Sequence, residues 1–146
     1  MDRRDFIVTS SQAGVGICLA ALLGEGCATA AKYAEITVEK NKISLRKSEF
    51  QYTKKGQVHE RTFLLIKPEK AVFPICLYKK ADKYIACLMR CTHQDCEVEL
   101  QGTRYICPCH GSEFSNEGAV LTGPAEEPLR TFKTEQDETH IHILVA

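Results

Sequence analysis

Apolar and polar residues alternate in several short stretches of this chain, as they do in strands that bury one face. In residues 139–145, Ile141, Ile143 and Val145 share one face, and His140 and His142 share the other. No stretch has a helical period, so the sequence predicts an all-β fold. The predicted strands are residues 35–39, 43–46, 61–67, 72–78, 84–89, 97–100, 103–106, 119–121, 129–133 and 139–145.

Two of these strands, residues 72–78 and 84–89, form a predicted hairpin that turns at Ala81-Asp82. This turn places Cys76 opposite Cys87. Two small buried thiols are the favoured outcome at that position, and a cross-strand disulfide is the alternative.

Two segments rich in cysteine and histidine follow this hairpin, and we call them box 1 (residues 91–96) and box 2 (residues 107–112). A short hairpin around Gln101-Gly102 separates them and brings them together at its open end. Each box offers one thiolate and one imidazole. Two thiolates suit one iron of a 2Fe–2S cluster and two imidazoles suit the other, which raises the reduction potential. The candidate ligands are Cys91, His93, Cys107 and His110.

The boxes read Cys91-Thr92-His93-Gln94-Asp95-Cys96 and Cys107-Pro108-Cys109-His110-Gly111-Ser112. They resemble the paired motifs of the Rieske iron–sulfur proteins, Cys-Thr-His-Leu-Gly-Cys and Cys-Pro-Cys-His-Gly-Ser. The resemblance implies one Rieske-type 2Fe–2S cluster per chain, bound by the four candidate ligands. It also implies a disulfide between Cys96 and Cys109, and a hydrogen bond from Ser112 to a cluster sulfide.

The implied architecture is a Rieske-type antiparallel β-sandwich, with a small cluster-binding subdomain at about residues 90–129 inserted as a hairpin with two loops. Residues 123–129 resemble the proline-containing loop that closes over one side of the cluster in this family. Pro124 and Pro128 restrict that backbone. We therefore expect a stiff cover that excludes water.

Two departures from the respiratory members bear on the potential and on the partner. Those members have tyrosine at the position of Phe114, donating to a ligand sulfur, so we expect a lower potential here. Gln94-Asp95 replaces the apolar tip that docks into the quinol pocket of cytochrome b, and an unpaired charge there is costly to bury. Between neutral and alkaline pH, once the electron is coupled to one proton on a histidine, we expect a potential that falls by about 59 mV per pH unit.

The chain has 146 residues and balanced charge, with 19 basic and 19 acidic side chains. This length allows one domain, residues 31–146, after an N-terminal extension. The neutral charge and the lack of a basic face give no case for nucleic acid. Arg3-Arg4 precedes an uncharged run and resembles a twin-arginine export signal in residues 1–30. This segment could be cleaved after residue 30 or retained as a membrane anchor. An ordinary signal sequence with a basic start is the alternative to a twin-arginine signal.

The favoured function is one-electron transfer on the outer, periplasmic face of the cytoplasmic membrane, in the iron–sulfur subunit of a quinol–cytochrome c reductase of the cytochrome bc type. By resemblance, His110 would accept the quinol hydrogen bond there, with cytochrome b and c subunits as partners. The alternative is a small subunit or partner of another exported oxidoreductase, as in the molybdenum enzyme arsenite oxidase. An aromatic-ring oxygenase, its ferredoxin and a structural zinc site fit the residues less well. In the favoured function and in its alternative, the chain is an electron-transfer subunit rather than a self-sufficient enzyme.

Overall fold

The computed structural model describes residues 32–145, which fall within the compact unit Ala31–Ala146. The expected export segment, residues 1–30, lies outside the described residues. The described chain is almost entirely antiparallel β-structure, which confirms the all-β prediction. Within residues 32–145, no helix has the length and apolar character needed to cross a membrane.

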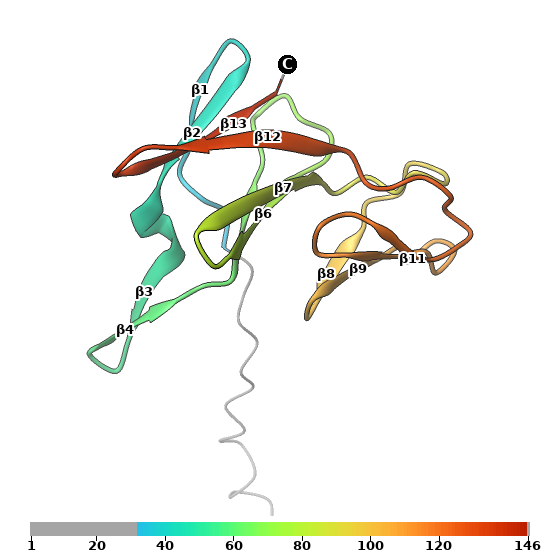
Figure 1. Ribbon diagram of the computed structural model, residues 1–146, viewed down its shortest axis with the longest axis horizontal. Coiled ribbons are helices and arrows are strands. Elements are labelled where there is room, and N and C mark those ends of the chain that lie inside the picture. Colours follow the sequence, from blue (N-terminus) through green and yellow to red (C-terminus); the bar gives the residue numbers. More distant parts are fainter. Residues whose placement is uncertain (1–31, 146) are drawn as a thin grey trace, which may run out of the picture. The chain divides into compact units, whose positions relative to one another are not determined.

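Seven strands form one sheet, in the order β1-β2-β13-β12-β7-β6-β5, which we call the base sheet (Figure 1). Its strands are β1 (Thr37–Glu39), β2 (Lys42–Arg46), β5 (Phe63–Ile66), β6 (Ile75–Lys80), β7 (Lys83–Leu88), β12 (Thr131–Gln136) and β13 (His140–Leu144). Each of these strands overlaps a predicted strand by most of its length, except β12, of which the prediction covered the first half. The pattern of apolar residues therefore located the base sheet correctly.

A second sheet, in the order β11-β10-β9-β8, carries the two boxes, and we call it the tip sheet. Its strands are β8 (Glu99–Gln101), β9 (Arg104–Ile106), β10 (Glu113–Ser115) and β11 (Val120–Thr122). Box 1 lies between β7 and β8, and box 2 between β9 and β10. Along the chain, the tip sheet is inserted between β7 and β12, which pair with each other in the base sheet, and this confirms the inserted hairpin with two loops.

The hairpin of β6 and β7 is buried on both faces, because each face carries a separate core. Leu77 and Ala86 point into a core with β2, β5 and β13. Cys76 and Cys87, one residue away along each strand, point into a core with the tip sheet. Successive side chains of a strand point to opposite faces, so one hairpin joins the base sheet to the tip sheet. This arrangement holds the boxes against the centre of the fold.

Besides strand β10 of the tip sheet, two features are absent from the sequence prediction. A short 3-10 helix, η1 (Lys47–Phe50), places Phe50 in the core of the base sheet. It leads into a two-stranded hairpin of β3 (Gln51–Lys54) and β4 (Gln57–Glu60), whose side chains are nearly all exposed. Its turn, Lys55-Gly56, has positive φ at both residues, and this dipeptide was the available signal for the hairpin.

Candidate metal centre

Main-chain hydrogen bonds give box 1 its curvature. The Cys91 N–H donates to the Cys96 carbonyl at 2.8 Å, and the Asp95 N–H donates to the Cys91 carbonyl at 3.0 Å. Asp95 has a φ of 59°, in the left-handed region. Arg90 donates to its carboxylate through Nε at 2.8 Å and lies 2.7 Å from the second oxygen through Nη2. This contact lowers the pKa of Asp95. The Asp95 carboxylate, which departs from the family motif, is therefore paired with a positive charge.

Box 2 repeats the same pattern of main-chain bonds. The Cys107 N–H donates to the Ser112 carbonyl at 2.8 Å, and the Gly111 N–H donates to the Cys107 carbonyl at 3.0 Å. Gly111 has a φ of 77° and corresponds to the left-handed residue of box 1. The two loops therefore have matching shapes, each built around a leading cysteine.

The structure separates the predicted ligands by depth. Cys91 and Cys107 are buried, with exposed fractions of 1% and 2%. His93 and His110 are exposed, and their ring centroids lie 4.9 Å apart in an edge-to-face arrangement. The sulfur donors thus lie within the fold and the nitrogen donors lie together at its surface.

A disulfide joins the two boxes between Cys96 and Cys109, as the resemblance implied. Within residues 32–145, the potential metal ligands whose ligand atoms all lie within 4.8 Å of one another are these two sulfurs and that of Cys107. Two of the three are bonded to each other, so this group is not a three-ligand site. One tetrahedral zinc would need its four ligand atoms within about 4 Å of one another. The four candidate ligands form no such group among the residues described.

The proline-containing loop, residues 123–129, is bonded to both boxes, and we call it the strap. The Thr92 hydroxyl of box 1 donates to the Glu127 carbonyl at 2.6 Å. The Ala125 N–H donates to Oγ of Ser112 in box 2 at 3.0 Å. Sequence reasoning identified the strap but missed Thr92, whose role is visible only in the folded chain.

Ser112 fits the role of a donor to a bound cluster. Its side chain is fully buried, and its oxygen already accepts a hydrogen bond from the strap. The hydroxyl proton is therefore directed away from Ala125. A buried hydroxyl needs an acceptor, and a cluster sulfide would supply one. The residues present consequently fit a cluster placed between the boxes.

Phe114 is fully buried and lies directly opposite Tyr105, its partner on β9. The Tyr105 hydroxyl has no hydrogen-bond partner among the described residues. Burial, and then the Cys76 and Cys87 thiols beside it, raise the pKa of Tyr105. These thiols are free and are Cα partners across β6 and β7, which confirms the predicted register. Burial raises the pKa of Cys76 to about 12 and that of Cys87 to about 11.

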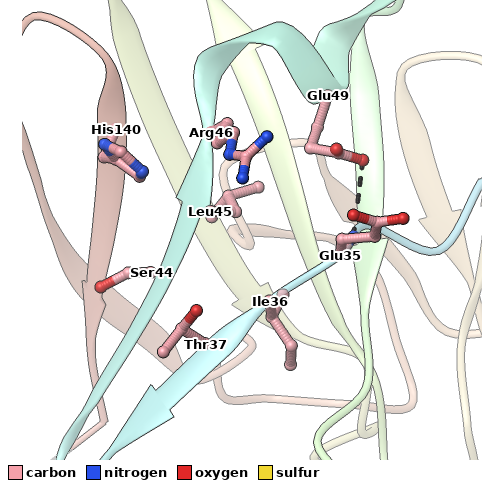
Figure 2. A pocket seen from close by; sticks show the side chains of 8 residues that line it. All are labelled: Glu35, Ile36, Thr37, Ser44, Leu45, Arg46, Glu49 and His140. Carbon is pink, nitrogen blue, oxygen red and sulfur yellow. Dashed lines mark hydrogen bonds between the residues drawn. The ribbon is translucent and has the colours of Figure 1, made fainter.

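Away from the boxes, a polar pocket of about 220 Å³ lies over β1, β2 and β13 (Figure 2). Glu35 and Glu49 line it, with the Glu35 N–H donating to Glu49 Oε2 at 3.4 Å. Arg46 and His140 also line it, and none of its residues comes from either box. The candidate metal centre, with its two exposed histidines and two buried thiols, is therefore separate from this pocket.

Comparison with known proteins identifies the family. Residues 43–133 match the family model of the Rieske [2Fe-2S] domain. The chloroplastic iron–sulfur subunit of the cytochrome b6-f complex from Oryza sativa subsp. japonica is 37% identical over 70 residues, which cover 44% of this chain and 31% of that protein. The cytochrome b6-f iron–sulfur subunit of Trichodesmium erythraeum is 51% identical over 37 residues, 24% of this chain and 21% of that one. The chain thus spans less than a third of either relative.

Among solved structures, the chain is similar to the plasma membrane Rieske protein of the cyanobacterium Synechocystis PCC 6803. The identity is 30%, the TM-score is 0.49, and the match covers 56% of this chain and 85% of that chain. The family model spans more than half of the chain, including both boxes and the strap. The chain therefore belongs to the Rieske [2Fe-2S] domain family, and it is an iron–sulfur electron-transfer protein with a Rieske-type 2Fe–2S cluster.

Proposed function

We propose that this chain is the iron–sulfur subunit of a membrane quinol–cytochrome c reductase of the cytochrome bc type. The observation that carries the proposal is the pair of exposed rings, His93 and His110, above the buried thiols of Cys91 and Cys107. Local similarity to iron–sulfur subunits of cytochrome b6-f complexes supports the choice of complex.

In this proposal Cys91 and Cys107 would hold one iron, and His93 and His110 would hold the other. When bound, the cluster takes up and releases a single electron. The buried thiols are shielded from water, whereas the histidine rings face the solvent and a docking partner. The ring nitrogen of His110 that faces away from the metal would accept the hydrogen bond of a quinol and receive its proton. Ser112 would donate its hydroxyl to a cluster sulfide.

The ligand assignment is tested by the absorption and electron paramagnetic resonance spectra of the reduced protein. His93→Ala and His110→Ala should each abolish the Rieske signal, whereas His140→Ala, at a histidine outside the boxes, should leave it intact. A spectrum that survives both replacements in the boxes would refute the assignment.

We further propose that residues 1–30 direct export through the twin-arginine pathway to the outer face of the cytoplasmic membrane. The support is Arg3-Arg4 before an uncharged run. Replacement of both arginines by lysine should retain the protein in the cytoplasmic fraction, whereas Lys54→Arg should not change its location. Export of the paired-lysine variant at the normal level would contradict this proposal.

A second function is favoured by the polar tip of box 1. Gln94 is exposed and Asp95 is held by Arg90, so this tip suits a polar partner surface better than an apolar quinol pocket. The chain would then be the small electron-transfer subunit of another exported oxidoreductase, of the arsenite-oxidase type. Copurification from native membranes separates the two: a cytochrome b supports the first function and a molybdenum enzyme the second.

A further inference from the structure

The neutral net charge of the chain conceals an uneven distribution. Residues 90–130, which include both boxes, the tip sheet and the strap, carry three arginines and seven carboxylates, a net charge of −4. The rest of the described chain carries 14 basic and nine acidic side chains, a net charge of +5. The two charges lie on different segments of one compact unit, so the charge of this unit is unevenly distributed.

Three of the carboxylates in residues 90–130 are neutralised locally. Asp95 pairs with Arg90 at 2.7 Å, Glu113 pairs with Arg104 at 2.8 Å, and Glu117 contacts the Lys80 ammonium. The other four side chains are exposed and have no ion-pair partner among the described residues. These four, which we call the acidic rim, are Glu97, Glu99, Glu126 and Glu127.

The acidic rim borders the two loops that carry the histidines. The main-chain carbonyl of Glu127 accepts the hydrogen bond of Thr92, the residue before His93, and Glu126 precedes Glu127 in the strap. Glu97 directly follows Cys96, whose disulfide leads to Cys109, the residue before His110.

The fourth member of the rim, Glu99, pairs across the tip sheet with Ile106. Ile106 immediately precedes box 2. Two members of the acidic rim therefore lie in the strap, and the other two lie beside the ends of the boxes that carry His93 and His110.

We infer that the histidine end of this domain docks a redox partner whose contact surface is basic, with lysine or arginine around the point of electron transfer. This inference rests on the proposed function, because the histidines must be the exposed edge of the cluster. Complementary charge raises association rates by concentrating and orienting the partner. A like-charged, acidic partner would be repelled by the same rim.

The test uses the cluster-loaded protein and two small one-electron oxidants of opposite charge, the tris(phenanthroline)cobalt(III) trication and the hexacyanoferrate(III) trianion. In each reaction one electron passes from the reduced cluster to the metal complex. Between 10 and 300 mM salt, the rate constant for the trication should fall by about fivefold or more and that for the trianion should rise, because salt screens exposed charges. The opposite signs would overturn the inference.

Matched variants locate the effect. Glu126→Gln with Glu127→Gln should lower the trication rate at low salt by about threefold, because it removes two charges of the rim. Glu69→Gln with Glu138→Gln changes the net charge equally at exposed positions outside residues 90–130, and should change that rate by much less. The potential of each variant is measured so that rates are compared at known driving force. Equal effects of the two pairs would overturn the inference.

The spectrum separates failure of this inference from failure of the proposed function. A Rieske spectrum that depends on both histidines, together with salt-independent rates, would refute the inference of a basic partner and leave the proposed function intact. Loss of histidine dependence in the spectrum would remove both.

Discussion

At the scale of single residues, the departure of box 1 from the family pattern has a local explanation. The family places glycine at the position of Asp95, and the structure shows why, since this residue has a left-handed φ of 59°. Aspartate enters that region more readily than most residues. Its carboxylate also reaches Arg90. An unusual residue is thus accommodated without reshaping the loop.

This explanation predicts that backbone conformation, more than charge, decides which residues are tolerated at position 95. Asp95→Ala should lower the free energy of unfolding by about 1 kcal/mol, because alanine is strained at positive φ. Asp95→Gly loses the same carboxylate without that strain and should be closer to the wild type. Chemical unfolding of both variants measures the difference, and equal losses would contradict the backbone explanation.

Phe114 predicts the direction of a change in potential. A hydroxyl added by Phe114→Tyr should raise the reduction potential by about 40 mV, the equivalent of a hydrogen bond of about 1 kcal/mol to a ligand sulfur. The control is Tyr105→Phe, which removes the hydroxyl of the opposite residue, beside thiols that are not candidate ligands. Redox titration should find the control unchanged, and a lowered potential in Phe114→Tyr would refute the prediction.

At the scale of elements, the strap connects the boxes through two side-chain bonds that differ in their expected effect on the cluster. Ser112→Ala should lower the reduction potential, because the reduced, more negative form loses a donor. Thr92→Val removes the other bond to the strap and should leave the potential near that of the wild type. Protein-film voltammetry measures both, and equal shifts would mean that Ser112 acts only through the strap.

The disulfide between the boxes predicts a loss of stability on reduction. Replacing Cys96 and Cys109 by serine should lower the free energy of unfolding by about 3 kcal/mol, because the unfolded chain gains the freedom of an open loop. Dithiothreitol should destabilise the wild type and leave this double variant unchanged. A wild type indifferent to the reductant would contradict the prediction.

The elements that were predicted from sequence are those in which burial imposes a pattern. Strands β2 and β13 alternate because one face is buried, and the Ala81-Asp82 turn fixed the pairing of Cys76 with Cys87. The hairpin of β3 and β4 was missed because its side chains are nearly all exposed, so no alternation is enforced. Ligand types, spacing and the Cys96–Cys109 pair followed from the motif, whereas the strap bond of Thr92 joins residues 35 positions apart.

At the scale of the whole molecule, the buried thiols of Cys76 and Cys87 predict a loss of stability in alkali. Burial raises their pKa values to about 12 and about 11 from an ordinary value of 9.0. Above pH 9 the unfolded chain loses these protons while the folded chain keeps them, so stability falls as the pH rises towards 11. From pH 9 to pH 10 the two thiols together should reduce the free energy of unfolding by about 2 kcal/mol.

The double replacement Cys76→Ala and Cys87→Ala is the control for this prediction. Urea unfolding at the two pH values should show a smaller decline in the variant than in the wild type. Identical declines would mean that other groups cause the alkaline loss.

The matching hydrogen bonds of the two boxes have a consequence for how such centres diversify. Both loops take their curvature from main-chain atoms and from one residue in the left-handed region. The main-chain conformation at positions 93 and 110 therefore does not depend on which side chains stand there. Exchanging an imidazole for another donor would change the electronic character of the metal while the main chain of the box keeps its conformation. A few substitutions are therefore enough to change the reduction potential of such a protein.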